Sequence, residues 1–219
     1  MNHNPLSQPV KRHTIRQQMR KFRRALSPRQ QHQAGLDLKK NLAKQPLFIR
    51  SERIAFYLAN DGEINPSPLL DLALSLGKKC YLPVLAPGVN KAIWFIRYKH
   101  NTPMQRNRYG IAEPKINLSQ RLKAPQLDLV LMPLVAFDKE GGRLGMGGGY
   151  YDRCFAFKQR SQQHNPYLLG LAHNGQQSCD LPLESWDIPL ACIATDEKLV
   201  ICSKTSSCRD FKISVRNRR

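Results

Sequence analysis

A glycine-rich segment between an arginine and an aspartate is the part of the sequence whose residue types and spacing best suit chemistry. Four glycines lie at positions 145 and 147–149, after Arg143 and before Asp152. Glycines that precede a helix let successive backbone N–H groups converge on an anion, and the helix dipole favours negative charge there. Arg143 supplies a fixed positive charge for phosphate, and Asp152 can hold a divalent cation that phosphates also bind. The segment therefore predicts a phosphate-binding loop, with a glycine-rich turn for tight strand–helix packing as the alternative.

This loop differs from the two common nucleotide-binding loops. No Gly-Lys-Ser/Thr sequence follows its glycines, as a Walker A loop requires. Tyr150 stands where the dinucleotide-binding fingerprint has its last glycine. The segment is therefore neither of these loops.

Alternating strand and helix patterns must position the loop. Apolar runs bounded by turn residues predict strands at 53–58, 80–85, 93–98, 127–135, 167–172 and 192–195. Amphipathic or capped segments predict helices at 15–26, 28–44, 69–76 and 150–162. The alternation predicts an α/β fold, a single domain with a mostly parallel central sheet flanked by helices. The segment 101–125, rich in Pro, Asn and Arg, is expected to be a long ordered loop over one end of the sheet.

The first of these helices is basic, and an apolar stripe indicates the face that packs. The stripe is formed by Ile15, Met19, Phe22 and Leu26. The arginines are expected on the remaining surface: Arg16, Arg20, Arg23 and Arg24. A capping box of Ser27 and Gln30 then starts the second helix.

The charge of the chain is concentrated at its two ends. The formal net charge is +19, with 35 Lys and Arg against 16 Asp and Glu. Residues 1–50 hold 12 basic and 1 acidic residue, and residues 198–219 hold 7 and 1. This distribution favours anionic partners near the termini, either nucleic acid or nucleotide phosphate, over partners near the middle. A solvated helix face with a disordered tail is the alternative.

Composition also predicts the compartment and the extent of the folded domain. No apolar run reaches the roughly 18 residues of a membrane helix, and residues 1–25 do not resemble an export signal. We therefore expect neither membrane insertion nor Sec export. The six cysteines form no CxxC pair and are expected to be free thiols in a reducing cytoplasm. The folded domain is expected at 1–202, with 1–10 flexible and 203–219 a disordered basic tail.

Several motifs together resemble one enzyme family. The segment Arg143–Arg153, preceded by Pro133–Asp138, is similar to the signature of the 5-formyltetrahydrofolate cyclo-ligases, also called methenyltetrahydrofolate synthetases. Further matching segments follow in the expected order over roughly residues 11–202: Ile15-Arg16, Arg23–Ser27, Ile54–Glu63, Gly77-Lys78, Tyr81–Pro83, Gly110–Pro114, Leu181-Pro182 and Trp186–Pro189.

The resemblance implies a Rossmann-like fold and an ATP- and Mg²⁺-dependent reaction. The 5-formyl oxygen of 5-formyltetrahydrofolate would attack the γ-phosphate of ATP, and N10 would then close the ring to 5,10-methenyltetrahydrofolate, releasing ADP and phosphate. Such chemistry asks mainly for positioning and charge neutralisation. The partners would be these small molecules, with nucleic acid bound only weakly through the basic ends, no membrane, and a monomeric chain.

The resemblance also implies which residues contact ATP and perform the reaction. The ATP-binding residues would be Arg12, His13, Thr14, Ile15 and Arg16 together with Arg143, Leu144, Gly145, Met146, Gly147, Gly148, Gly149, Tyr150 and Tyr151. The catalytic residues would be Arg143, Tyr151 and Asp152.

The same resemblance implies folate and metal contacts. Folate would contact Leu58, Glu63, Tyr109 and the loop residues Met146, Gly147, Gly148, Gly149 and Tyr150. Mg²⁺ would bind Asp152 and Asp196, although Glu197 could replace the latter. Each assignment has a structural alternative, such as an apolar strand end for Leu58, a loop anchor for Tyr109 and an acidic turn for Asp196.

Two other functional classes remain open from the sequence. The net charge and the arginine-rich helix are compatible with a basic nucleic-acid-binding protein, but no RNA- or DNA-binding signature occurs. An ATP-dependent kinase or ligase acting on another small substrate would share the phosphate loop. Only the folate side of the site, Leu58, Glu63 and Tyr109, argues against that alternative.

Overall fold

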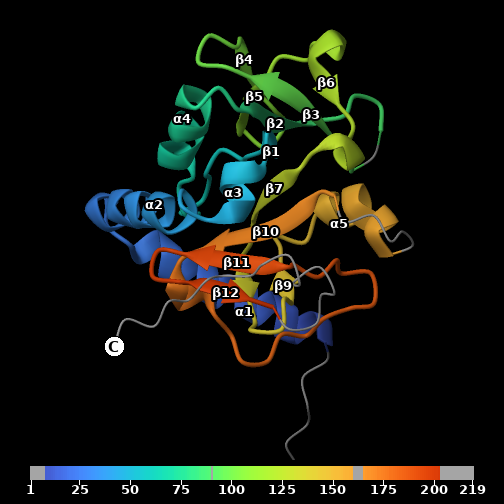
Figure 1. Cartoon of the computed structure of the whole chain (residues 1–219). Helices are drawn as coiled ribbons and strands as arrows, with labels where there is room; N and C mark the ends of the chain where they lie inside the picture. Colours follow the sequence, from blue (N-terminus) through green and yellow to red (C-terminus); the bar gives the residue numbers. More distant parts are fainter. Residues whose placement is uncertain (1–7, 90, 160–164, 203–219) are drawn as a thin grey trace, which may run out of the picture.

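A central sheet with helices on both faces organises the chain (Figure 1). The computed structural model describes residues 8–89, 91–159 and 165–202. Within them the sheet has eight strands in the order β12 (Leu199–Ile201), β11 (Cys192–Thr195), β10 (Tyr167–Ala172), β7 (Leu129–Pro133), β1 (Arg53–Ala55), β2 (Lys79–Leu85), β3 (Ile93–Tyr98) and β6 (Arg121–Leu122). The predicted tail 203–219 and the predicted helix end 160–162 lie outside the described residues.

The centre of the sheet is parallel and its edges are antiparallel. β1 pairs in parallel with β2 and β7, and β10 pairs in parallel with β7 and β11. β12, β3 and β6 add antiparallel neighbours. The predicted α/β fold with a mostly parallel sheet is confirmed. Because the central strands are parallel, the carboxyl ends of β1, β2, β7, β10 and β11 meet at one edge, where open α/β sheets bind ligands.

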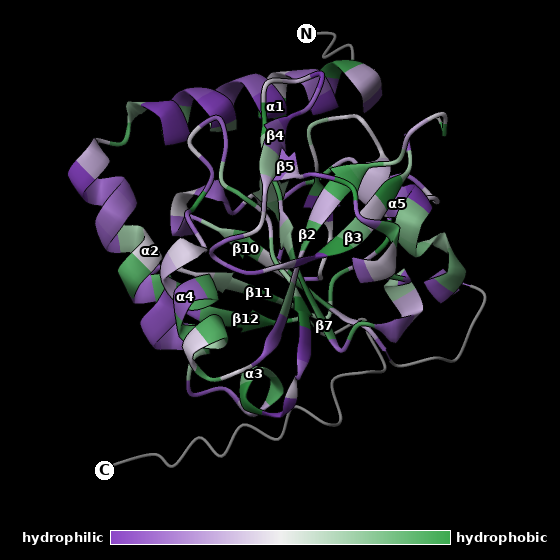
Figure 2. Cartoon of the chain, turned by 90° about the horizontal axis from the view of Figure 1, so that it is seen from above, coloured by the Kyte–Doolittle hydropathy of each residue, from purple (hydrophilic) through white to green (hydrophobic). Residues whose placement is uncertain are grey.

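The helices cover the two faces of the sheet. The described helices are α1 (Gln8–Ala25), α2 (Pro28–Leu42), α3 (Pro46–Arg50), α4 (Ser67–Ser75) and α5 (Tyr150–Phe155). Figure 2 shows α2 and α4 on one side of the strands and α5 on the other. Leu38, Leu69 and their neighbours form one buried core, and Phe155 with Phe95 belongs to the core on the opposite face. No described helix combines the length and the apolarity needed to cross a bilayer.

The helix α1 lies over a small hairpin that carries the glycine loop. This hairpin is formed by β8 (Ala136–Phe137) and β9 (Arg143–Leu144). Ile15 and Met19 pack against the buried Ala136 and Leu144, so the first half of the predicted apolar stripe packs, whereas Phe22 is 37% exposed and Leu26 follows the helix end. One prediction about α1 is wrong, because Arg23, expected on the solvent side, is fully buried and is the helix's only buried residue.

Local start and stop signals were predicted with mixed success. The capping box is confirmed, since Ser27 and Gln30 bond reciprocally and α2 begins at Pro28. The helix predicted at 69–76 begins two residues earlier, since α4 spans Ser67–Ser75 with Pro66 at its N-cap. Helix α5 ends at Phe155 and continues as a 3₁₀ turn, η3 (Ala156–Gln159). Helix α1 already begins at Gln8, inside the segment 1–10 that was expected to be flexible.

The segment 101–125 is more ordered than a loop. It contains a hairpin of β4 (Met104–Arg106) and β5 (Ala112–Pro114), the strand β6, and the 3₁₀ turns η1 (Leu118–Gln120) and η2 (Ala124–Gln126). The buried carboxylate of Glu113 secures this hairpin by accepting hydrogen bonds from Leu85 N–H and from Gln105. Strands of two or three residues are too short to show a period-two pattern, so the sequence did not reveal them.

The cysteines agree with the sequence analysis. The five described cysteines are free thiols: Cys80, Cys154, Cys179, Cys192 and Cys202. Cys208 lies outside the described residues.

Candidate active site

The loop after β1 places two carboxylates at the carboxyl edge of the sheet. Asp61 accepts hydrogen bonds at 2.8 Å from Arg20 Nε and Arg23 Nη2, and a further one from Arg24. Although burial alone would raise its pKa, these three arginines hold the pKa of Asp61 at about 2. Asp61 therefore remains a carboxylate at any physiological pH and ties α1 to the end of β1.

Glu63 lies two residues further on and is bound more loosely. Its side chain is 12% exposed, and Oε1 lies 4.0 Å from Arg23 Nη1. Oε2 accepts a hydrogen bond from Asn60 N–H at 3.1 Å, whereas Oε1 accepts none from the described part of the chain. Burial raises the pKa of Glu63 to about 7, against the opposing charge of Arg23. The carboxylate thus keeps one oxygen for another partner.

The backbone between these carboxylates is constrained on both sides. Gly62 has φ 74°, and a Cβ there would lie 2.8 Å from the carbonyl oxygen of Arg23, so only glycine fits this position. Its carbonyl accepts a hydrogen bond from Gln31 Nε2 at 3.2 Å and faces His173 Nε2 at 3.3 Å. Burial lowers the pKa of His173.

On the other side of the site, an arginine from β9 pairs with the first turn of α5. Arg143 Nη2 donates to Asp152 Oδ1 at 2.5 Å, and Ile188 N–H donates to the same oxygen at 3.2 Å. Arg143 is 4% exposed, and its buried Nε has no hydrogen-bond partner among the residues that the structure describes. A buried guanidinium with a free donor is a cation that an additional anion can satisfy.

The glycine loop between these residues is held by side chains from elsewhere. Gly147 and Gly149 have φ 96° and 65°, in the left-handed region that favours glycine. Arg16 Nε donates to the Gly145 carbonyl at 2.8 Å, and its guanidinium would lie 3.6 Å from a Cβ at Gly147. Arg153 donates to the Gly148 carbonyl. The predicted convergence of α1 on the glycine loop is therefore present in the fold.

The other predicted nucleotide-binding residues of α1 have different surroundings. Arg12 Nη1 donates to Asp187 Oδ2 at 2.8 Å and to the Pro182 carbonyl at 2.9 Å. Thr14 bonds to a carbonyl of its own helix, and His13 is exposed. Of residues 12–16, only Arg16 contacts the glycine loop directly through a hydrogen bond among the described residues, and the nucleotide roles of the others stay predictions.

The two predicted metal ligands have separate neighbours. Asp196 follows β11, and its Oδ1 accepts a hydrogen bond from Asn174 N–H at 2.7 Å. Glu197 accepts one from the Asn174 side chain. In the described residues, no group of three or more His, Cys, Asp or Glu side chains is arranged to hold a metal. Metal binding by Asp152 and Asp196 therefore stays a prediction.

Two tyrosines stand at the mouth of the site. The hydroxyls of Tyr109 and Tyr150 are 2.9 Å apart, and their rings meet edge to face at 6.4 Å. Arg108 stacks on Tyr109 and donates to the Tyr150 hydroxyl. Tyr150 and Arg108 line an open groove of about 470 Å³ that also contains Lys91, Arg106 and the segment after β2. An exposed aromatic pair beside a basic groove suits a ligand that is part ring and part anion.

A family model for the 5-formyltetrahydrofolate cyclo-ligases matches residues 8–196. The chain belongs to this family. The predicted family and enzyme class, a cyclo-ligase, are thus confirmed. The 5-formyltetrahydrofolate cyclo-ligase of Haemophilus influenzae is 43% identical over 82% of this chain and 95% of that protein. The Escherichia coli K12 protein of the same name is 38% identical over 83% of this chain and 98% of its own.

A solved structure supports the same assignment. The 5,10-methenyltetrahydrofolate synthetase of Aquifex aeolicus superimposes with a TM-score of 0.75 at 27% identity, over 89% of this chain and 94% of that one. The shared architecture includes the central sheet, so the site described above lies on the common fold.

Sequence reasoning missed three residues of the buried contacts between α1, the loop after β1 and the end of β7. Arg23 and Asp61 were not predicted as site residues, and neither was Gln176, whose Nε2 donates to the carbonyls of Leu134 and Val135 at 3.1 and 2.8 Å. One signal was available, because Arg23 follows Ile15 and Met19 at intervals of four and therefore lies on the row that packs. An arginine in such a row indicates a buried ion pair whose partner comes from another element.

Proposed function

We propose that this chain converts 5-formyltetrahydrofolate to 5,10-methenyltetrahydrofolate with ATP as co-substrate, releasing ADP and phosphate. One observation carries the proposal. Arg23 Nη2 donates to Asp61, two residues before Glu63, at 2.8 Å and lies 3.7 Å from the sulfur of Met146 in the glycine loop. The loop that carries the proposed folate contact and the loop that carries the proposed phosphate contacts thus meet at one side chain, although Glu63 and Arg143 lie 80 positions apart in the sequence.

The folate end of the site supplies acceptors and an apolar surface. The free Oε1 of Glu63 accepts hydrogen bonds from the amino group and ring N–H of the pterin. Leu58, partly buried beside the core, gives the ring an apolar contact. Tyr109 and Tyr150 cover the next part of the substrate, and the basic groove beyond them receives the carboxylates of its glutamate.

The phosphate end supplies positive charge and backbone donors. Arg16 and the buried Arg143 converge on the glycine loop from two elements. The N–H groups of residues 147–149 add donors that need no side chain. Together they neutralise the triphosphate, which is the main requirement of phosphoryl transfer.

The two predicted metal ligands fit Mg²⁺ in their chemistry. Asp152 and Asp196 each use Oδ1 for a protein hydrogen bond, and neither Oδ2 accepts one from the described residues. Carboxylate oxygens are the donors that Mg²⁺ prefers in proteins. Bound there, Mg²⁺ would supply charge neutralisation for the phosphate oxygens.

The reaction then proceeds in two steps within this frame. The formyl oxygen attacks the γ-phosphorus, the bond to the β–γ bridging oxygen breaks, and ADP leaves. N10 attacks the formyl carbon and loses its proton, and phosphate leaves with the formyl oxygen. Glu63 orients the pterin for both steps, Arg143 neutralises the transferred phosphoryl group, and the neutral Tyr151 hydroxyl donates a hydrogen bond between them.

The arrangement of the arginines disfavours the nucleic-acid alternative. In α1, the side chains of Arg12, Arg20, Arg23 and Arg24 pair with carboxylates of the same chain. Arginines whose donors are engaged within the chain offer fewer contacts to the phosphates of a polyanion, although three of these four share the single carboxylate of Asp61.

The decisive experiment is incubation of the purified protein with 5-formyltetrahydrofolate and MgATP, following methenyl absorbance together with ADP and phosphate. We expect one ADP and one phosphate for each methenyl group formed. Binding of MgATP without any methenyl product would favour a kinase or ligase acting on another substrate. Binding of nucleic acid in the absence of either small-molecule ligand would favour the basic-protein alternative.

A further inference from the structure

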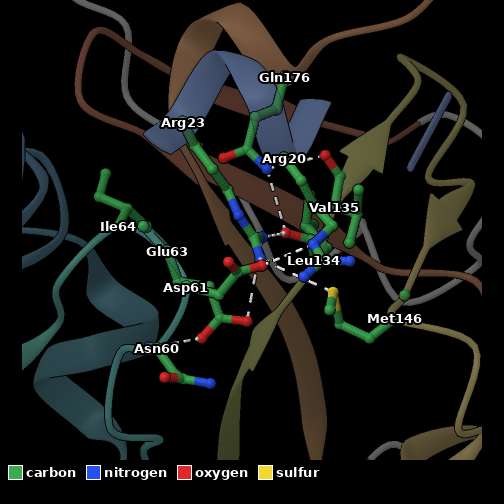
Figure 3. Close-up of polar contacts among 12 residues, drawn as sticks. Arg20, Arg23, Asn60, Asp61, Glu63, Ile64, Leu134, Val135, Met146 and Gln176 are labelled. Carbon is green, nitrogen blue, oxygen red and sulfur yellow. Dashed lines mark hydrogen bonds and ion pairs between the residues drawn. The ribbon is translucent and has the colours of Figure 1, made fainter. Parts of the chain in front are cut away.

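Arg23 occupies the centre of the contacts between α1 and the folate end of the site (Figure 3). Its side chain is fully buried. Nη2 donates to Asp61 Oδ2 at 2.8 Å and lies 3.7 Å from the sulfur of Met146, in the glycine loop. Nη1 donates to the Leu134 carbonyl at 3.4 Å, at the end of β7. The guanidinium therefore touches the end of β7, the loop after β1 and the glycine loop at once.

The relation between Arg23 and Glu63 differs from an ordinary salt bridge. The 4.0 Å between Nη1 and Oε1 is too long for a hydrogen bond. Nη1 directs its hydrogen bond to Leu134 instead. Arg23 thus places a positive charge beside Glu63 without using the oxygen that a ligand needs.

We propose that Arg23 is a positioning residue for folate, whose buried charge favours the carboxylate form of Glu63 and leaves its free oxygen open toward the pterin. The proposal rests on the proposed function, because it takes Glu63 as the pterin contact. Arg23 itself touches no substrate in this assignment. Its effect passes entirely through Glu63.

Among the groups that surround Glu63, Arg23 is the charge that favours ionisation of its carboxyl group. The titratable or charged groups that face Glu63 are Arg23 from α1, Asp61 from its own loop, Tyr57 after β1 and Tyr151 from α5. Burial raises the pKa of both tyrosines, so they stay neutral, and Asp61, with a pKa of about 2, stays charged. His173, just after β10, faces the Gly62 carbonyl. Arg23 is therefore the favourable charge among these groups.

Arg24 provides a matched control within the same helix. It also pairs with Asp61, but its side chain is 56% exposed and faces solvent. A general loss of the α1–Asp61 connection would affect Arg24 and Arg23 variants alike. The charge that favours ionisation of Glu63 would be lost only in the Arg23 variant.

The test compares Arg23→Gln, Arg23→Lys and Arg24→Gln by steady-state kinetics and by thermal unfolding. Removing an opposite charge 4–6 Å away raises a carboxyl pKa by about 1–3 units, so at pH 7 we expect the folate KM of Arg23→Gln to rise roughly tenfold or more. The kcat and the MgATP KM should stay within about twofold. The folate KM of this variant should fall again as the pH is raised, because Glu63 then ionises. The folate KM of Arg23→Lys should stay close to that of the parent, and the folate KM of Arg24→Gln should equal it.

A double variant separates positioning from a merely structural role. In a Glu63→Gln background there is no carboxylate for Arg23 to keep charged, so adding Arg23→Gln should change the folate KM by less than about twofold. An equal increase in both backgrounds, or a parallel rise in the MgATP KM, would overturn the proposal. If Arg23→Gln does not fold, Arg23→Lys provides the test, because it keeps the positive charge. A shift of the pH dependence of its folate KM to higher pH would contradict control by charge.

The experiment distinguishes this inference from the proposed function. A parent protein that forms no methenyl product would contradict the proposed function. An active parent whose Arg23→Gln variant has an unchanged folate KM would contradict only the role of Arg23.

Discussion

At the end of β1, Asp61 and Glu63 lie beside a fully buried arginine that bonds to Asp61, whereas at the end of β9 the glycine loop is held by Arg16 and by the Arg143–Asp152 pair. Asp61 receives three arginines, and Gly62 has no room for any side chain. At the glycine loop, each cation engages a group that a ligand could replace. Arg16 uses the Gly145 carbonyl, and Arg143 uses Asp152.

This difference indicates how each end would meet its ligand. We expect the proposed folate end to be preorganised, because Asp61, Gly62 and Arg23 are held by contacts within the chain that a substrate need not displace. We expect the proposed phosphate end to exchange partners on binding, because Arg143 pairs with Asp152 and Arg16 with the Gly145 carbonyl. Variants at the two ends should therefore affect different ligands.

The largest effect is expected from Asp152→Asn at the phosphate end. Loss of a group that stabilises charge in a reaction typically costs about 100–1,000-fold in turnover, so we expect a decrease of about 100-fold or more, together with a higher Mg²⁺ requirement. Folate binding should change little. Activity measured as a function of Mg²⁺ concentration gives both the decrease in turnover and the Mg²⁺ requirement.

Asp71→Asn is the matched control, because Asp71 is exposed on α4. Its activity should equal that of the parent. Since Arg143 is buried, thermal unfolding of Asp152→Asn must also be recorded. An Asp152→Asn protein with the parent's turnover and Mg²⁺ dependence would show that Asp152 serves only to pair with Arg143.

The next largest effect is expected from Glu63→Gln at the folate end. Loss of a charge-assisted hydrogen bond costs about 1.5–3 kcal/mol, so folate affinity should fall by roughly 10- to 100-fold. Binding of MgATP should stay nearly unchanged, as titration of each ligand separately would show. Glu52→Gln, an exposed change just before β1, is the control. Equal losses for both ligands would mean that the two ends are not independent.

A smaller effect concerns the pH dependence of unfolding, in which the two carboxyls of the β1 loop oppose each other. The pKa of Asp61 is lowered from 3.8 to about 2, so its stabilisation is present above about pH 4 and is lost as the pH falls toward 2. The pKa of Glu63 is raised from 4.5 to about 7, so its contribution is lost as the pH rises through that range. Each amounts to about 2–3 kcal/mol. Denaturant unfolding of Asp61→Asn and Glu63→Gln should remove the acid-side and neutral-side slopes respectively, and unaltered slopes would contradict these assignments.

The smallest effect is expected from Arg108→Ala in the basic groove. Arg108 is exposed, so its attraction for the substrate carboxylates is screened by salt. We expect the folate KM to rise about two- to fivefold at low ionic strength and to approach the parent value at high salt. Arg121→Ala, an exposed arginine over Trp94, should show no change. A salt-independent increase would instead indicate that Arg108 acts by holding Tyr109 and Tyr150.

Much of the local architecture could be inferred from the sequence, because the patterns involved span only a few residues. The capping box of Ser27 and Gln30, the strand Tyr167–Ala172 and the glycine loop depend on neighbours within one or two turns of chain. The family resemblance came from the same kind of ordered local motifs and was confirmed over residues 8–196. The short strands of 101–125 escaped because two or three residues carry no period.

The arrangement of the site required the tertiary structure. Arg23 can be buried because Asp61, 38 positions away, and Leu134, 111 positions away, accept hydrogen bonds from its two terminal nitrogens, while its Nε has no partner among the described residues. An arginine costs too much to bury without such partners, so the residue type favoured the solvent side even though its row in α1 packs. Likewise, only the parallel pairing of β1, β7, β10 and β11 brings the Glu63 loop and Asp196 to one edge of the sheet. The residue types that can do chemistry are visible in short segments of this chain. Which charges are desolvated and paired depends on contacts between segments that are far apart in the sequence.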